Sequence, residues 1–235
     1  MSLVVFGEFV VIVSVRLIPE ARSGGVGGEA VDYLRATVFL GACVGLLHVL
    51  AQVKGQVAEA RSAAAAMTEL ANTDVLTGIA NRRQLHTALQ ERLAEAEAAP
   101  GEDPLAVVLL DLDHFKQIND THGHDAGDAV LRRVALTLAE VVRPTDLLGR
   151  WGGEEFLVIA PRTSPADAAA LAERCRASLA DTAFPVVGRV TASLGVAMHR
   201  PGDSAWQLLR RADDALYGAK ASGRDAVRYH RAGAA

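Results

Sequence analysis

The stretch Leu105-Ala-Val-Val-Leu-Leu-Asp-Leu-Asp113 decides the fold class of this chain. Its first six residues are Leu, Ala and Val only, and a run this short is typical of a strand that is buried in a sheet. Two carboxylates, Asp111 and Asp113, follow the apolar run directly. The sequence therefore predicts a buried strand that ends in acidic side chains.

Other predicted elements alternate around this strand. Leu147–Ala160 holds two short apolar segments on either side of Gly152-Gly153, which predicts a β-hairpin. Val186–Met198 contains one or two strands, and the helical segments are Gln84–Ala98, Gly127–Val142, Pro165–Ala180 and Ser204–Ser222. The order strand, helix, hairpin, helix, strand predicts an α+β fold with a palm-like or ferredoxin-like central antiparallel sheet flanked by helices.

In a palm-like sheet the end of the first strand lies beside the tip of the hairpin. Asp111 and Asp113 would then converge with Glu154 and Glu155, and such carboxylates repel one another unless they share a cation. Mg²⁺ fits because it prefers oxygen ligands and is usually held by one or two carboxylates together with substrate phosphates. It can polarise a phosphoryl group and activate an attacking hydroxyl. Gly152-Gly153 would let a phosphate or nucleobase approach the backbone.

Five ordered motifs of the chain resemble the GGDEF family, the bacterial diguanylate cyclases, over about residues 72–230. They are Asp74-Val-Leu-Thr-Gly-Ile-Ala-Asn-Arg-Arg83, Asp111-Leu-Asp-His-Phe-Lys-Gln-Ile-Asn-Asp-Thr-His-Gly-His-Asp-Ala-Gly-Asp128, Arg150-Trp-Gly-Gly-Glu-Glu-Phe156, Ser193-Leu-Gly-Val-Ala197 and Ala212-Asp-Asp-Ala-Leu-Tyr-Gly-Ala-Lys-Ala-Ser-Gly-Arg-Asp225. The third is similar to the family's signature turn in its GGEEF form. The one departure is Asp225, where the family commonly has Asn, and it puts no doubt on the activity.

The resemblance implies an enzyme that condenses two GTP molecules into cyclic di-GMP with release of two pyrophosphates. By the same resemblance, Asp111, the carbonyl of Leu112 and Glu154 would hold Mg²⁺, with Mn²⁺ as an alternative ion. Glu154 would be the base for the 3′-hydroxyl, and Glu155 is the second candidate. Because each family domain binds one GTP, two half-sites must face each other in a homodimer.

The resemblance also assigns the residues that hold the substrate. Asn119 and Asp128 would read guanine, whose N1–H and N2–H₂ groups can donate to a carboxylate. Lys116, Lys220 and Arg224 would neutralise triphosphate charge, and Phe115, Gly152 and Gly153 complete the substrate-binding set.

One further segment resembles the family's RxxD motif, and the resemblance implies a site for inhibition by the product. Arg143-Pro-Thr-Asp146 precedes Gly152-Gly153 with five residues between them, and Arg174 on the following helix is a further contact. An Arg can bind phosphate or guanine through two hydrogen bonds. Two alternatives to the cyclase stay open: a catalytically silent cyclic di-GMP receptor that binds at Arg143 and Asp146, and an enzyme that makes another cyclic dinucleotide, against which Asp128 argues.

The first 53 residues hold most of the chain's apolar excess, which amounts to 50% hydrophobic residues overall. Met1–Pro19 is apolar except for Glu8 and Arg16, and Ala36–Val53 is a second apolar run, just long enough to span a bilayer. Two interpretations stay open. One is a membrane hairpin in the bacterial inner membrane, or the tail of a larger membrane or sensor domain, and the other is a buried helical pair in a soluble sensor or dimer interface. Basic residues after the second run favour a cytoplasmic catalytic domain.

Apolar residues recur at steps of three and four from Cys43 to Ala71, which predicts a coiled-coil seam and a homodimer through residues 43–71. The alternative is a helix that packs on its own domain. The predicted organisation is a hydrophobic helical region at 1–53, a coiled-coil linker at 54–72, a catalytic domain at 73–230 and a tail at 231–235.

The bulk composition argues against a nucleic-acid partner and excludes a disulfide framework. A formal net charge of −4 argues against a nucleic-acid partner, because proteins that bind such polyanions normally carry a basic surplus. Only two cysteines occur, so a disulfide framework is excluded and the usage fits a reducing compartment.

Overall fold

The computed structural model describes residues 27–98 and 104–230 of the chain. The chain divides into two compact units between Met67 and Thr68. The described part of the first unit is a single helix, and the second unit holds a sheet with helices. The predictions made for Met1–Pro19 and for the tail at 231–235 lie outside the described residues.

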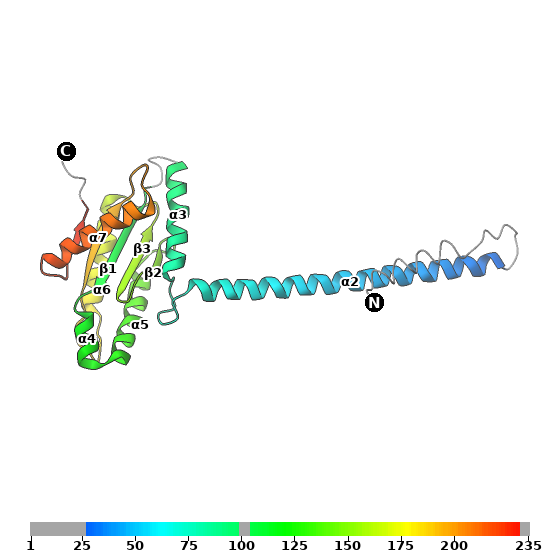
Figure 1. Cartoon of the computed structure of the whole chain (residues 1–235), viewed down its shortest axis with the longest axis horizontal. Coiled ribbons are helices and arrows are strands. Elements are labelled where there is room, and N and C mark those ends of the chain that lie inside the picture. Colours follow the sequence, from blue (N-terminus) through cyan, green and yellow to red (C-terminus); the bar gives the residue numbers. More distant parts are fainter. Residues whose placement is uncertain (1–26, 99–103, 231–235) are drawn as a thin grey trace. The chain divides into compact units, whose positions relative to one another are not determined.

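The second unit is built on a five-stranded sheet with the strand order β2-β3-β1-β4-β5 (Figure 1). The strands are β1 (Ala106–Leu112), β2 (Leu147–Arg150), β3 (Glu155–Ala160), β4 (Ala192–Met198) and β5 (Val227–Tyr229). The pairs β2–β3, β3–β1 and β1–β4 are antiparallel, while β5 runs parallel to β4 at the edge. The predicted central antiparallel sheet is confirmed, and the parallel edge strand β5 was not predicted.

Helices cover both faces of this sheet (Figure 1). They are α3 (Arg82–Ala98), α4 (Phe115–His122), α5 (His124–Val141), α6 (Pro165–Asp181) and α7 (Ala205–Ala221). Four of the five were predicted, with ends shifted by three residues or fewer. The short helix α4 was not predicted, because its N-cap residue His114 adopts a left-handed conformation and gives no side-chain hydrogen bond.

Strand β1 supplies both hydrophobic cores of the unit. Val108 and Leu110 belong to the core formed with α5 and α6, whereas Val107 and Leu109 belong to the core formed with α3 and α7. All seven residues of β1 are buried, which explains why the strand is continuously apolar instead of alternating. The prediction of a buried central strand is confirmed.

The described part of the first unit belongs to α2 (Gly27–Asn72), a helix of 46 residues. The helix ends at Asn72, directly before Thr73-Asp74, where the sequence predicted its end. The segment Leu34–Glu59 is long and apolar enough to cross a membrane, and none of its most apolar stretch is buried against the rest of the described chain.

Candidate active site

The acidic end of β1 lies directly beside the tip of the β2–β3 hairpin. Asp111 is the register partner of Glu155, and the amide of Leu112 donates to the carbonyl oxygen of Glu154 over 3.3 Å. The antiparallel pairing of β1 with β3 thus brings together two acidic segments that lie more than 40 residues apart in the chain. The predicted adjacency of these two segments is confirmed.

All three carboxylates of this acidic cluster, Asp111, Glu154 and Glu155, have a pKa raised above the ordinary value, mainly by burial. Asp111 is only 6% exposed, and its burial raises its pKa despite an ion pair from Lys220 Nζ at 2.8 Å. Burial also raises the pKa of Glu154 and Glu155, and the charge of Asp111 raises both further. The cluster therefore holds more negative charge than its neighbours neutralise, and it would be stabilised by a cation.

Asp113 does not join this cluster, contrary to the expectation from sequence. Its carboxylate accepts hydrogen bonds from Ser193 Oγ at 2.7 Å, from Thr191 Oγ1 at 2.8 Å and from the amide of Asp225 at 3.0 Å. Ser193 lies on β4, Thr191 directly precedes that strand, and Asp225 lies on the segment before β5. Asp113 is therefore a structural residue that ties the end of β1 to the opposite side of the sheet.

The cluster offers the oxygen donors that Mg²⁺ prefers, from Asp111 and Glu154. In the described parts of the chain, no group of three or more His, Cys, Asp or Glu side chains is arranged to hold a metal ion without further ligands. An ion held by one or two carboxylates needs phosphate oxygens to complete its shell. The donor set thus fits a metal that arrives with a nucleotide better than a permanent structural metal.

Arg150 fixes the glycine turn that precedes Glu154, a role that the sequence did not reveal. Its Nη2 and Nε atoms donate to the carbonyl oxygen of Gly153 at 2.7 and 3.2 Å, and its Nη1 lies 3.3 Å from both carboxylate oxygens of Asp74. Asp74 in turn accepts from the amide and hydroxyl of Thr77. Asp74 belongs to the first of the five motifs and Arg150 to the third. This was the only hint in the sequence that the two residues act together.

The motif from Asp74 to Arg83, called the opening motif below, also closes the C-terminal end of α2. The side-chain amide of Asn81 donates to the carbonyl oxygens of Ala71 at 2.8 Å and Thr73 at 3.3 Å. Arg83 donates to the side chain of Asn72 at 3.0 Å. The bond to Ala71 satisfies one of the carbonyl groups that a helix end otherwise leaves without partners, and the other two bonds hold the residues at and just after that end. The motif from Asp74 to Arg83 thus connects the end of α2 to the glycine turn.

The predicted guanine readers lie on the adjoining helices α4 and α5. A Cβ atom on Gly127 would collide with the side-chain oxygen of Asn119 and would lie 3.2 Å from the ring of Phe115. Asn119 is therefore packed against the residue that immediately precedes Asp128. Phe115 is buried in the core, with 5% of its surface exposed, and packs beneath the contact between Asn119 and Gly127. Lys116 is exposed.

Two of the predicted triphosphate cations are at the acidic cluster. Lys220, on the last turn of α7, forms the ion pair with Asp111, and the charge of Arg224 also lowers the pKa of Asp111. Glu155 lies so close to Gly152 that a side chain there would collide with its carboxylate. The structure thus brings Asp111, Glu154, Glu155, Gly152, Lys220 and Arg224 together.

The predicted product-site residues lie away from this cluster. The side chain of Asp146 accepts from the amide of Arg143 at 2.9 Å, and its other oxygen is buried without a hydrogen-bond partner among the described residues. Burial raises the pKa of Cys175 on α6 to about 12, and the neighbouring charges of Arg174 and Asp146 also act on this thiol. The loop and α6 are therefore close, while Arg143 and Arg174 are both exposed.

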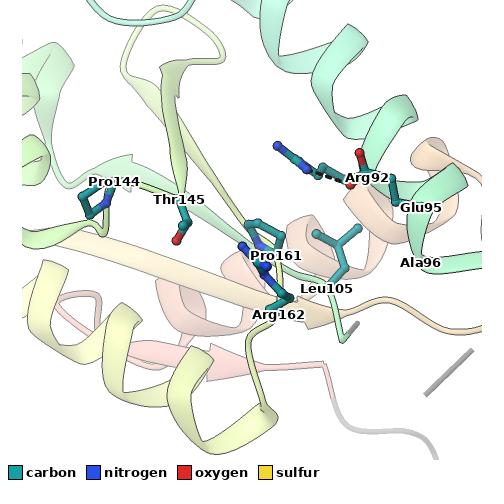
Figure 2. A pocket seen from close by; sticks show the side chains of 8 residues that line it. All are labelled: Arg92, Glu95, Ala96, Leu105, Pro144, Thr145, Pro161 and Arg162. Carbon is teal, nitrogen blue, oxygen red and sulfur yellow. Dashed lines mark hydrogen bonds and ion pairs between the residues drawn. The ribbon is translucent and has the colours of Figure 1, made fainter. Parts of the chain in front are cut away.

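A hollow of about 260 Å³ lies at the other end of β1, beside Leu105 (Figure 2). Its lining residues are Arg92, Glu95, Ala96, Leu105, Pro144, Thr145, Pro161 and Arg162. Figure 2 shows Pro144 and Thr145 on one side of the hollow and Arg92 and Glu95 of α3 on another. Because Leu105 precedes β1 and Asp111 lies near its end, this hollow is separate from the acidic cluster.

Comparisons with known proteins agree with this geometry. Residues 71–226 match the family described as diguanylate cyclase, GGDEF domain. The response regulator PleD of Caulobacter vibrioides is 51% identical over 165 residues, which are 68% of this chain and 36% of PleD. The diguanylate cyclase DgcM of Escherichia coli is 42% identical over 161 residues, which are 67% of this chain and 38% of DgcM. The chain thus spans little more than a third of the length of these relatives.

Solved structures resemble the chain as well. The coiled coil and GGDEF domain of DgcB from Caulobacter crescentus, in complex with c-di-GMP, has a TM-score of 0.73 and 35% identity, and the match covers 78% of this chain and 98% of that one. The active GGEEF domain of a diguanylate cyclase from Vibrio cholerae has a TM-score of 0.61 and 35% identity, with 64% and 97% covered. The family match extends over more than half of the chain, and the chain belongs to the GGDEF-domain family of diguanylate cyclases.

Proposed function

We propose that this chain condenses two molecules of GTP into cyclic di-GMP and releases two pyrophosphates. The observation that carries the proposal is the meeting of Asp111, at the end of β1, with the Glu154-Glu155 turn beside Lys220 and Arg224. Acidic groups that can hold Mg²⁺ and basic groups that can hold a triphosphate are the two requirements of nucleotidyl transfer.

In each condensation the 3′-hydroxyl oxygen of one GTP attacks the α-phosphorus of the other. A new P–O bond forms, the bond to the pyrophosphate oxygen breaks, and the hydroxyl proton passes to a base. We assign the base to Glu154, with Glu155 as the alternative, because a carboxylate whose pKa is raised by burial is a better proton acceptor near neutral pH. Lys220 and Arg224 would bind the triphosphate and neutralise its charge.

Asp111, the carbonyl oxygen of Leu112 and Glu154 would hold Mg²⁺, or Mn²⁺ in its place. When bound with the nucleotide, the ion supplies Lewis acidity at the α-phosphate. The surplus of negative charge in the cluster supports this assignment, since burial and mutual repulsion disfavour three free carboxylates at this position.

The choice of guanine is assigned to Asn119 and Asp128. The packing of Asn119 against Gly127 supports a joint site, because it brings both side chains to the corner between α4 and α5. A carboxylate at this corner can accept from N1–H and N2–H₂ of guanine, whereas adenine has no matching donors there. GTP is thus the favoured substrate over ATP.

We infer that α2 serves both as a membrane anchor and as a dimer stalk. At about 100° per residue, the exposed side chains of Leu34, Phe39 and Val44 spread around the whole helix, as a lipid contact requires. Leu50, Val53 and Val57 instead fall within about 60° of one another, as a helix-pairing seam requires. The seam positions Ala64 and Met67 lie among residues whose side chains are outside the described set.

The dimer would bring two half-sites together, since each domain binds one GTP. Asn81 and Arg83 bind the end of α2, and Arg150 binds both Asp74 and Gly153. A change in the stalk could therefore reach the turn that carries Glu154 through the opening motif. Deleting residues 1–70 should lower activity and make it more dependent on protein concentration, and unchanged values would contradict the stalk role.

Inhibition by the product is assigned to Arg143, Asp146 and Arg174. The buried and unpartnered oxygen of Asp146 and the two exposed guanidinium groups supply an acceptor and two donors for a guanine edge or a phosphate. The location away from the acidic cluster suits a site that acts on domain placement rather than on chemistry.

The function is tested by incubating the protein with GTP or with ATP in the presence of Mg²⁺ and identifying the products by mass spectrometry. Cyclic di-GMP from GTP, and little or no product from ATP, is expected. A chain that binds cyclic di-GMP without consuming GTP would instead be a receptor, and a product containing adenine would contradict the role of Asp128.

A further inference from the structure

The turn that follows α7 has an unfavourable backbone conformation. Gly223, Arg224 and Asp225 have φ angles of 111°, 63° and 41° in succession. Glycine adopts such angles freely, but residues with a Cβ atom rarely do, and they remain there only when the surroundings hold them. The turn begins shortly after Lys220, so its backbone conformation determines the direction of the Arg224 side chain.

Asp225 is the residue through which the surroundings hold this turn. Its carboxylate accepts from Arg176 Nη1 of α6 at 2.5 Å and from Arg189 Nη2 at 3.0 Å. The Arg176 and Asp225 side chains are 22% and 28% exposed, so this ion pair is largely shielded from water. The Asp225 amide also donates to Asp113 Oδ2. The turn is thus tied both to α6 and to the end of β1.

Arg224 is the group that this attachment directs. Its amide donates to the carbonyl oxygen of Ala219 at 3.2 Å, and its positive charge acts on Asp111 in the acidic cluster. A free turn would allow Arg224 to leave the cluster, because the residue is exposed and its described hydrogen bond is to the backbone only. The fixed position of its neighbour therefore governs the position of Arg224.

We propose that Asp225 is a positioning residue for GTP, which holds Arg224 at the triphosphate site through its ion pair with Arg176. The proposal rests on the proposed function of the chain and adds to it a residue at which the chain departs from its family. An Asn in this place has one acceptor oxygen and no charge, so it cannot keep charge-assisted bonds to both Arg176 and Arg189.

The test compares Asp225→Asn and Asp225→Ala with the wild-type chain. The KM for GTP and the dissociation constant of 3′-deoxy-GTP, which lacks the attacking hydroxyl, should each rise about fivefold to tenfold, as expected for a displaced charged contact. The value of kcat should change by about twofold or less, because Asp225 touches neither glutamate of the turn. Asp203→Asn is the matched control: it breaks the ion pair with Arg211 near the other end of α7 and should leave KM unchanged.

A second comparison separates positioning from a general structural role. In an Arg224→Ala background, Asp225→Asn should raise KM no further, since its effect passes through Arg224. An equal rise in that background, or an unchanged KM in both Asp225 variants, would overturn the proposal. Turnover of GTP by the wild-type chain is measured first, so that failure of the proposed function is distinguished from failure of this inference.

Discussion

Replacing Arg150 with Met tests how the glycine turn is held in place. Arg150 is the only described side chain that binds the carbonyl oxygen of Gly153 and the carboxylate of Asp74 at once. Methionine keeps much of the aliphatic volume but offers no donor. Lysine is not an adequate substitute, because a single ammonium group cannot reproduce the planar arrangement of donors that reaches both partners.

The size of the effect follows from the contacts. The Arg150–Asp74 pair is only 17% and 22% exposed, so it is worth more than a surface ion pair, and hydrogen bonds to charged groups contribute about 1.5–3 kcal/mol each. Asp74 keeps its bonds from Thr77, which limits the loss. We expect the free energy of unfolding to fall by about 2–3 kcal/mol, which is about 4–12 °C in Tm for a domain of this size.

Activity should fall as well, because the loosened carbonyl belongs to the residue immediately before Glu154. A loss of about 1.4–2.8 kcal/mol in transition-state stabilisation corresponds to a kcat lowered about tenfold to a hundredfold. Thermal unfolding and initial rates of pyrophosphate release measure the two effects. Arg92→Met, which breaks an exposed pair with Glu95, is the control and should cost about 0.5 kcal/mol or less. An Arg150→Met variant as stable and active as that control would show that Arg150 does not hold the glycine turn in place.

Three further predictions follow from charges and burial. Burial alone would raise the pKa of Asp74, but its bonds with Thr77 and Arg150 hold this pKa below the usual value of 3.8. The charged Asp74 therefore stabilises the fold fully above pH 3.8, and this stabilisation should be lost as the pH falls further. In acid unfolding curves, the part of the pH dependence that comes from Asp74 should be absent from Asp74→Asn, and an unchanged curve would contradict this role. Cys175, with its pKa raised to about 12, should resist thiol reagents at pH 8 in a Cys43→Ser variant until denaturant is added; rapid labelling would contradict its burial. Replacing Arg143 with Ala should relieve inhibition by cyclic di-GMP and leave the initial rate at low product unchanged; inhibition of wild-type strength would remove this residue from the product site.

The elements that could be predicted from sequence are those whose signal is local. The apolar run of β1, the hairpin around Gly152-Gly153 and the end of α2 each carry their own pattern, and all three are found. The strand β5 has only three residues and pairs in parallel with β4 after the intervening helix α7, so no turn signature marks it. Helix α4 follows a left-handed residue without a side-chain cap, which removes the usual start signal.

The candidate site was predictable to the same extent. Adjacent acids indicated that Asp111 and Asp113 face Glu154 and Glu155. The family resemblance singled out Asp111 for the metal, but no local pattern in the sequence gave a physical reason to separate it from Asp113. That distinction depends on Thr191 and Ser193, about 80 residues further on, whose hydroxyl groups satisfy Asp113. The ion pair between Arg176 and Asp225 is likewise a product of the fold, since the two residues lie 49 positions apart in the chain and no local pattern links them.

Turnover of GTP by Glu154→Ala, compared with the wild-type chain, tests the central assignment most directly. Pyrophosphate and cyclic di-GMP are quantified together with the binding of 3′-deoxy-GTP, so that loss of chemistry is separated from loss of substrate. We expect two pyrophosphates per cyclic di-GMP for the wild type and a turnover lowered at least about a hundredfold for the variant, as expected when a base is removed. Full turnover by Glu154→Ala would contradict the assignment of Glu154 as the base.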